Sequence, residues 1–243
     1  MDLSTFERRI YSQNGEDGVT VQLINMIYPE PEPHNKYYVE FGVENGRECN
    51  TRILREQYQW SGLQMDGGNE NLHINLRREY ITKDNIVPLF RKYKVPSHIN
   101  LLCIDIDFND FYCLHAILEN YRCDILICEY NAFHLPSVDA VIKYDEKGRW
   151  DCTNYFGASL LAFENLARRY NYSLVYCDKK GVNAFFIHND IIREKNLNFI
   201  HFGDIHNIYR KGGYGSGPNG SHGQDTRNRQ YITSEEAMRL YRA

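Results

Sequence analysis

The sequence predicts an α/β fold with a mainly parallel sheet and an antiparallel strand at the C-terminal edge. Two observations predict it. Short apolar runs alternate with segments of about 10–15 residues that show helical spacing, a pattern typical of successive βαβ units. The last two apolar runs, 172–178 and 183–190, are separated by only four residues, which suits a hairpin and therefore an antiparallel final strand.

The expected strands and helices alternate along the chain from residue 36 onward. Apolar runs predict strands at 36–43, 60–67, 99–107, 123–131, 172–178 and 183–190. Amphipathic spacing predicts helices at 51–59, 71–80, 110–121 and 158–171.

We expect one α/β domain followed by an appendage. The domain spans residues 1–200, and about the first 35 residues form an N-terminal lid segment. Residues 201–243 contain a glycine-rich stretch, 212–224, with six glycines in thirteen residues, and a short C-terminal helix capped by Thr233 or Ser234. The glycine-rich stretch either closes over a ligand or is disordered.

The composition argues against several classes of protein. The net charge of −4 gives no sign of a nucleic-acid or membrane surface, and no stretch approaches the ~18 consecutive apolar residues of a membrane span. The seven cysteines form no CxxC pair and no apolar signal segment starts the chain, so we expect reduced thiols and a cytoplasmic location. No cluster of His and Cys has the spacing of zinc ligands. The expected partner is a small molecule, and a homodimer is left open.

Polar residues follow the expected strands at one edge of the sheet. Ligands of open α/β sheets bind outside the carboxyl ends of the strands. A lone acid there is usually a turn or cap residue, but four strands in succession end in such groups, which predicts a site. The first strand supplies Glu40, Gly42, Glu44 and Gly46, the second Asp66, the third Asp105, Asp107, Asn109 and Asp110, and the fourth Glu129 and Asn131.

The first two strand ends indicate a cofactor with an adenosine group. Gly42 and Gly46 permit a tight turn and a close approach of a ligand to the backbone, although this spacing is not the dinucleotide G-x-G-x-x-G. Asp66 lies twenty residues after Gly46, where an acid accepts hydrogen bonds from ribose hydroxyls. Glu40 and Glu44 add negative charge where phosphates would lie, so a cationic cofactor such as S-adenosylmethionine fits better.

Several segments, taken in order, resemble FkbM-type methyltransferases and their uncharacterised relatives. The resemblance covers about residues 10–190 and implies a Rossmann-like class I methyltransferase fold that binds S-adenosyl-L-methionine. Its segments are SQNGEDGV (12–19), YVEFGVENGRECNT (38–51), WSGLQMD (60–66), LLCIDIDFND (101–110), ILICEYN (125–131), NYFGASLLAFENLA (154–167) and GVNAFFI (181–187).

The resemblance also implies roles for individual residues. Glu40, Gly42 and Gly46 would line the methionine part of the cofactor, and Asp66 would bind the ribose. Asn85 falls where such folds contact the adenine, and Asp105 falls beside the methyl-transfer centre.

The N-terminal motif SQNGEDGV has two interpretations. Asn14-Gly15 is typical of a turn before a helix, in which case the segment has a structural role. Alternatively Gln13, Glu16 and Asp17 fold over the cofactor, which would make Gln13 a cofactor-binding residue.

The acids after the third and fourth strands suggest a metal or a general base. Asp107, Glu129 and Asn131 offer the oxygen ligands that Mg²⁺ or Mn²⁺ prefers, and such a metal could bind the substrate and lower the pKa of its hydroxyl. Alternatively Asp107 or Asp110 caps the following helix. Without a metal, one of the acids Asp105 and Asp107 could act as the general base.

Other residues are candidates for the acceptor side of the site. His134, three residues after Asn131, is a second possible catalytic base or an exposed loop residue. Trp150, Asn154 and Tyr155 either shape an acceptor pocket or pack a loop on its helix. Asn183 could reach the same pocket or belong to the hairpin turn.

The sequence as a whole predicts methyl transfer from S-adenosylmethionine to an oxygen, less readily a nitrogen, of a small-molecule or sugar-like acceptor. Two alternatives remain: a noncatalytic nucleotide- or cofactor-binding module, and a nicotinamide-dependent oxidoreductase. The missing G-x-G-x-x-G disfavours the oxidoreductase, and the acids after the third and fourth strands disfavour the noncatalytic module.

Overall fold

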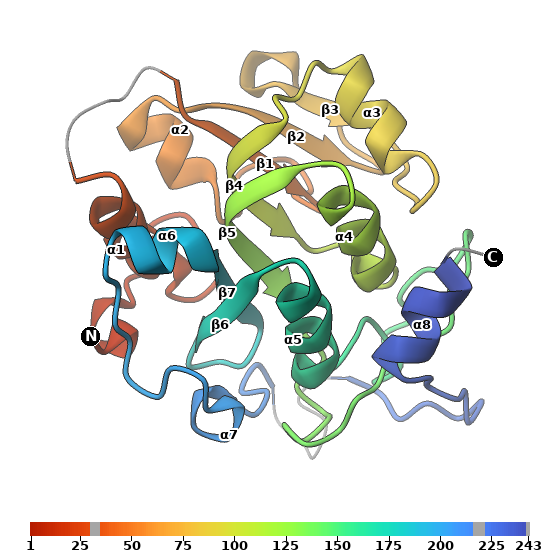
Figure 1. Ribbon diagram of the computed structural model, residues 1–243. Coiled ribbons are helices and arrows are strands. Elements are labelled where there is room, and N and C mark those ends of the chain that lie inside the picture. Colours follow the sequence, from red (N-terminus) through yellow and green to blue (C-terminus); the bar gives the residue numbers. More distant parts are fainter. Residues whose placement is uncertain (30–34, 216–221, 242–243) are drawn as a thin grey trace.

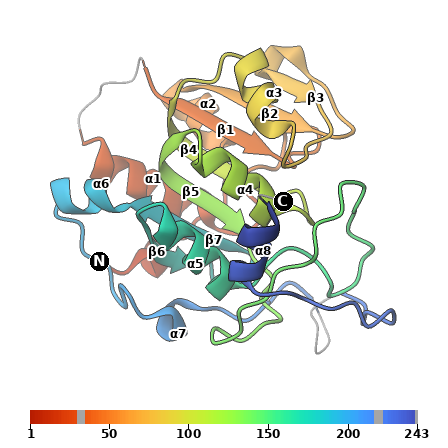
Figure 2. The ribbon, with the colours of Figure 1, turned by 45° about the vertical axis from the view of Figure 1, so that its right-hand side comes forward.

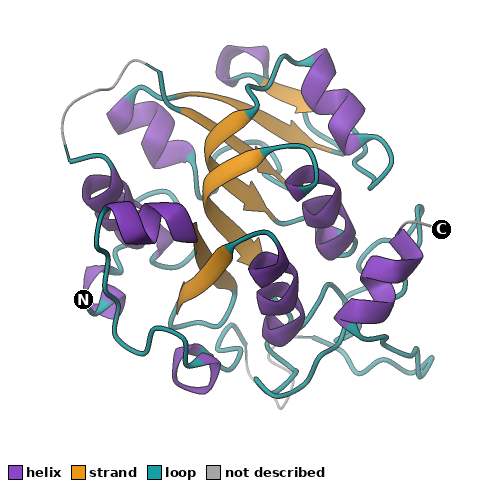
Figure 3. Cartoon of the chain, viewed as in Figure 1, coloured by secondary structure: helices purple, strands orange, loops and turns teal. Residues whose placement is uncertain are grey.

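A seven-stranded sheet forms the centre of the protein (Figures 1 and 3). The computed structural model describes residues 1–29, 35–215 and 222–241. The strand order is β3-β2-β1-β4-β5-β7-β6. The strands are β1 (Tyr37–Phe41), β2 (Ser61–Asp66), β3 (Leu76–Arg78), β4 (His98–Ile104), β5 (Arg122–Glu129), β6 (Tyr172–Cys177) and β7 (Asn183–His188).

The direction of the strands confirms the predicted Rossmann-like α/β fold with a mainly parallel sheet. Neighbouring strands from β3 to β5 pair in parallel, and β7 pairs antiparallel with both β5 and β6. The antiparallel strand expected at the C-terminal edge is therefore present. It is the inner strand of the β6–β7 hairpin, which forms that edge of the sheet.

Helices cover both faces of the sheet (Figure 2). They are α1 (Glu16–Ile27), α2 (Arg52–Tyr58), α3 (Ile86–Lys92), α4 (Asp110–Leu118), α5 (Leu160–Arg169), α6 (Asn189–Glu194), α7 (Ile205–Ile208) and α8 (Ser234–Tyr241), with short 3-10 turns η1 (Leu3–Phe6) and η2 (Leu72–Ile74). None of the described helices is long and apolar enough to cross a membrane.

Alternating side chains of the strands build two apolar cores, one on each face. Val39 and Leu102 face a core that α3, α4, α5 and α8 complete, whereas Tyr38 and Leu101 face a core that α1, α2 and α6 complete. The period of two along each strand thus separates the two layers.

The segment 71–80 was predicted to be helical, and this prediction is wrong. Asn71 caps only a single 3-10 turn, and Asn75 turns the chain back with a φ of +53°. Leu76 is fully buried and pairs with Gln64, which starts the outer strand β3. The short strand β3, of which only Leu76 is buried, pairs with β2 where a helix was expected.

The N-terminal segment packs into the domain. The carboxylate of Asp17, which is fully buried, accepts hydrogen bonds through Oδ2 from the backbone N–H groups of residues 10–12 and from the Ser12 hydroxyl. Residues of α1, such as Leu23 and Ile27, lie in the core beside β1 and β4. Residues 30–34 of the predicted lid segment lie outside the described residues.

The C-terminal appendage is anchored along the domain. Its helix α8 packs on α4 and α5, and the Thr233 hydroxyl accepts a hydrogen bond from the Glu236 N–H, which confirms the predicted helix and its cap. Val141 pairs with Ile232 in an isolated bridge that fixes the preceding segment. Residues 216–221 of the glycine-rich stretch and residues 242–243 lie outside the described parts.

We expect Asp17→Ala to lower the free energy of unfolding by about 3 kcal/mol, because the substitution leaves several buried donors without an acceptor. Asp2→Ala is the matched control. Asp2 is exposed and caps only the short turn η1, so its loss should cost about 0.5–1 kcal/mol. Urea unfolding measures both variants, and equal losses would contradict the role assigned to Asp17.

Candidate active site

A cavity of about 830 Å³ opens at the carboxyl ends of the central strands. Its volume suits a cofactor together with a small second ligand. Eight of the residues that line it are acidic, and among its described lining residues only Arg149 carries a permanent positive charge. The acids are Glu40, Glu44, Glu48, Asp66, Glu79, Asp105, Asp107 and Glu129.

Most of this negative charge has no cationic partner among the described residues. Glu48 pairs with Arg9 at 2.7 Å, and Glu79 pairs with Lys92 at 2.5 Å. None of the other six acids forms an ion pair with a residue in the described ranges. The cavity therefore favours a cationic ligand and disfavours phosphates.

At the end of β1, Glu40 holds the start of α2. Its carboxylate accepts hydrogen bonds from the backbone N–H groups of Asn50 and Thr51 at 2.8 and 2.9 Å and from the Thr51 hydroxyl at 2.6 Å. Glu40 is 3% exposed, so these donors compensate its charge where water cannot. Glu40 thus lines the cavity and also fixes the helix that follows the first turn.

Gly42 brings the chain after β1 into direct contact with the chain after β4. Its φ is +80°, and a Cβ at this position would lie 1.3 Å from the carbonyl oxygen of Asp105. Only glycine fits this position, because any side chain would overlap the backbone of the neighbouring strand end. The contact fixes the position of Asp105 relative to β1.

Asp66, at the end of β2, connects two loops beside the cavity. Its Oδ2 accepts the N–H of Glu44 at 3.0 Å, and its Oδ1 accepts the N–H groups of Gly68 and Asn69. A carboxylate has about four lone-pair positions, so capacity for ligand hydroxyls remains on Oδ2.

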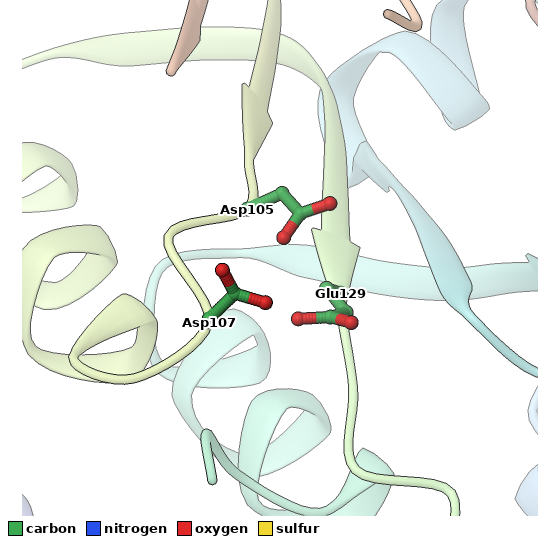
Figure 4. Close-up of side chains that lie close together, drawn as sticks. All are labelled: Asp105, Asp107 and Glu129. Atoms are coloured by element: carbon green, nitrogen blue, oxygen red, sulfur yellow. The ribbon is translucent and has the colours of Figure 1, made fainter. Parts of the chain in front are cut away.

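Three carboxylates converge after β4 and β5 (Figure 4). Oxygens of Asp105, Asp107 and Glu129 all lie within 4.8 Å of one another. Asp107 is the most exposed of the three and adopts a left-handed backbone conformation, with a φ of +63°. Such a conformation is uncommon outside glycine, although Asp tolerates it better than most residues.

The proximity of these acids raises their pKa values. Burial, followed by repulsion from neighbouring carboxylates, raises the pKa of Asp105 and of Glu129 well above the usual range. Burial and the charge of Glu44 also raise the pKa of Asp107. Burial and mutual repulsion therefore both favour the protonated form of these acids over the charged form.

Asp110 is next to this cluster in the chain but has a structural role. Its Oδ1 accepts the N–H of Ile106 at 2.7 Å, and burial raises its pKa to about 7. The predicted alternative that Asp107 or Asp110 caps α4 is not observed, because the N-cap residue is Asn109 and no side chain caps it.

The cavity brings together most of the predicted site residues. They come from the N-terminal segment and from the ends of β1, β2, β4 and β5. The predicted residues that line the cavity are Gln13, Glu40, Gly42, Asp66, Asp105, Asp107 and Glu129. Glu16 and Asp17 are fully buried and do not line it.

Gly46 and Asn85 do not line the cavity. Gly46 packs behind it, where a Cβ would lie 2.5 Å from a methyl carbon of Ile74. The amide of Asn85 accepts the N–H of Thr82 and donates to the carbonyl of Tyr80. Asn85 therefore braces the loop that carries Tyr80 and Ile81, and these two residues line the cavity in its place.

Asn131 and His134 also lie away from the cavity lining. The side-chain N–H₂ of Asn131 donates to the carbonyls of Asn154 and Phe156, and its oxygen accepts the N–H of Phe133, so the structure does not bring it to the acids as the predicted metal ligand. His134 packs edge-on against Tyr231, and burial lowers its pKa to about 4. This packing separates the predicted base from the cavity.

Sequence reasoning missed part of the acceptor side. Trp150 lines the cavity as expected, but Phe156 lines it in place of Asn154 and Tyr155. Tyr214 and His222 also line it, and the His222 ring lies 5.0 Å from the rings of Trp150 and Phe156. The glycine-rich stretch has no sequence periodicity. Its ring-bearing residues were therefore the only signal that could have indicated that it forms part of the cavity wall.

No family model and no curated protein matches the sequence. Among solved structures, the chain is similar to one described as the citrinin polyketide synthase CMeT domain, with a TM-score of 0.37 and 9% sequence identity. The match covers 74% of this chain and 54% of that chain, so this chain spans about half the length of that one.

We expect Gly42→Ala to lower the free energy of unfolding by about 3 kcal/mol or more, because the new methyl group overlaps the Asp105 carbonyl. Gly67→Ala is the matched control in the same cavity, since a Cβ there has its nearest neighbour at 3.9 Å. Urea unfolding compares the two. Equal stability of both variants would show that the contact between the two strand ends is not close.

Proposed function

We propose that the protein transfers a methyl group from S-adenosyl-L-methionine to an oxygen of a small-molecule or sugar-like acceptor. One observation carries the proposal: six acids that form no ion pair within the described parts of the chain surround a cavity at the carboxyl ends of parallel strands. This charge suits a cofactor that carries a sulfonium and an amino group. The likeness of the sequence motifs to FkbM-type methyltransferases supports the same conclusion.

The residues at the ends of β1 and β2 fit this cofactor. Gly42 leaves the backbone open to a ligand, Glu40 adds negative charge beside it, and Asp66 has acceptor capacity for the ribose hydroxyls. Tyr80 and Ile81 offer an apolar wall near Asp66 for the adenine. Gln13, from the N-terminal segment, lines the same cavity.

When bound, the cofactor would supply an electrophilic methyl group. The chain would then position the acceptor oxygen and remove its proton. Without a bound cation, Asp105 and Glu129 are suited to the second task, because a carboxylate with a raised pKa accepts a proton more readily at neutral pH. Trp150 and Phe156 would hold the body of the acceptor and exclude water.

The two alternative functions fit the cavity less well. A nicotinamide dinucleotide would place its diphosphate among unpaired carboxylates, which repel it. A noncatalytic binding module would gain nothing from three carboxylates held together after β4 and β5, because their repulsion costs stability.

We expect S-adenosylhomocysteine to raise the melting temperature in a concentration-dependent manner, because it binds the folded state only. At 100 times its Kd, the stabilisation should be about 2.7 kcal/mol. NAD⁺ at the same concentration should have no effect. A shift with NAD⁺ and none with millimolar S-adenosylhomocysteine would refute the proposed cofactor.

We expect Asp66→Ala to weaken the binding of S-adenosylhomocysteine by about tenfold or more, since hydrogen bonds to a charged group contribute about 1.5–3 kcal/mol. Isothermal titration calorimetry measures the change. Glu70→Ala is the control, because Glu70 is exposed and does not line the cavity. An unchanged affinity in Asp66→Ala, with the fold intact by circular dichroism, would remove Asp66 from the cofactor site.

A further inference from the structure

The acid cluster after β4 and β5 has the spacing of ligands around one cation. A cation that binds oxygens at about 2.1–2.5 Å holds them roughly 3–5 Å apart. The oxygens of Asp105, Asp107 and Glu129 lie within 4.8 Å of one another. No Lys, Arg or His among the described residues forms an ion pair with any of the three.

Asn183 provides a second, independent observation. It is the first residue of β7, it lines the cavity, and it is only 3% exposed. It pairs with Glu129 across the antiparallel strands β5 and β7. Directly paired residues project from the same face of a sheet with Cβ atoms about 4.5–5.5 Å apart, so the Asn183 amide lies beside the Glu129 carboxylate.

The orientation of the Asn183 amide is set from the N-terminal segment. Its Nδ2 donates a hydrogen bond to Oε1 of Glu16 at 2.9 Å. A carboxylate accepts only, so the N–H₂ group must face Glu16 and the Oδ1 must face the other way. The Oδ1 is buried and has no hydrogen-bond partner among the described residues. A buried acceptor without a donor is rare, and it indicates that a ligand completes the site.

We propose that Asp105, Asp107, Glu129 and Asn183 bind one divalent cation of the Mg²⁺ or Mn²⁺ class through four oxygens. Carboxylate and amide oxygens select hard cations of this kind, whereas zinc sites usually include nitrogen or sulfur ligands. Asn183 replaces Asn131 as the amide ligand. Glu16 is a positioning residue, because it acts by orienting the Asn183 oxygen.

The cation would have a role in the reaction only if the proposed function holds. It would then bind the acceptor hydroxyl and lower its pKa, so that the hydroxyl proton passes to solvent water. The oxygen would form a bond to the methyl carbon as the bond from that carbon to the sulfonium sulfur breaks, leaving S-adenosylhomocysteine. Cation binding itself does not depend on the methyl donor, so the two proposals can fail separately.

The test is isothermal titration of Mn²⁺ alone into the full chain after treatment with EDTA and removal of the chelator. We expect one saturable site in the wild type and an affinity at least tenfold lower in Asp107→Asn. Asp107→Asn should also raise the melting temperature in the absence of metal, because it removes one repelling charge and Asn tolerates the same backbone conformation. A gain in stability rules out misfolding as the cause of the lost affinity.

Two further comparisons locate the site. Asp84→Asn, whose side chain is 66% exposed and paired with Lys83, should bind Mn²⁺ as the wild type does. Asn183→Ala should bind Mn²⁺ severalfold more weakly than the wild type. Asn131→Ala, which removes an equally buried amide, should bind Mn²⁺ with the wild-type affinity after correction for the fraction of folded protein. Melting curves of both amide variants give that fraction.

The proposal is overturned if the wild type shows no saturation up to millimolar Mn²⁺, or if Asp107→Asn and Asp84→Asn bind equally. Retained affinity in Asn183→Ala would remove Asn183 from the ligand set. Binding of S-adenosylhomocysteine, measured on the same samples without metal, reports separately on the proposed function.

Discussion

The repulsion among carboxylates at the carboxyl ends of β1, β2, β4 and β5 is the constraint on which the site depends. Like charges that converge in a partly buried cavity destabilise the folded protein unless protons or a bound cation offset them. Hydrogen bonds compensate the charge of Glu40, which accepts three donors from the start of α2. Burial and the neighbouring carboxylates raise the pKa of Asp105 and of Glu129 well above the usual range. The repulsion within such a cluster lowers the stability of the folded protein, and the same negative charges attract cations.

The backbone keeps these charges close together. Gly42 lets the chain after β1 lie against the carbonyl of Asp105, and the Asp105 N–H donates a hydrogen bond to the carbonyl of Phe41, which holds the ends of β1 and β4 together. The antiparallel strand β7 places Asn183 beside Glu129, and the buried Glu16 reaches Asn183 from α1. Residues that are far apart in the sequence thus lie close together at the cavity. The two apolar cores, one on each face of the sheet, hold the elements that carry them in place.

The fold could be predicted from the sequence because its signals are local and agree with one another. Apolar runs of strand length, helical spacing between them and a four-residue hairpin connection each follow from the chain alone. The exception, 71–80, shows the limit. Its apolar residues have helical spacing, but the left-handed turn at Asn75 and the pairing of Leu76 with β2 are tertiary effects that override this pattern.

The site was predictable where residues directly follow a strand, as Asp66 and Glu129 do, because parallel strands end at one edge. The site was less predictable where the orientation of a side chain decides whether the residue lines the cavity. Asn131 follows the same strand as Glu129, yet its amide is used by backbone groups of the 154–156 loop. Asn183 lines the cavity, as one of its two interpretations predicted, but only the pairing of β7 with β5 shows that it lies beside Glu129. His222 lines the cavity because of the path of the C-terminal segment, which the sequence pattern does not show.

A crystal structure of the protein with S-adenosylhomocysteine tests the central claim most directly. We expect the ligand across the carboxyl ends of β1 and β2, with its ribose hydroxyls on Asp66 and its amino-acid part beside Glu40 and Gly42. Clear density for the ligand at any other place, or an empty cavity in crystals grown at saturating ligand, would contradict the assignment of this acidic cavity to a methyl-donor cofactor.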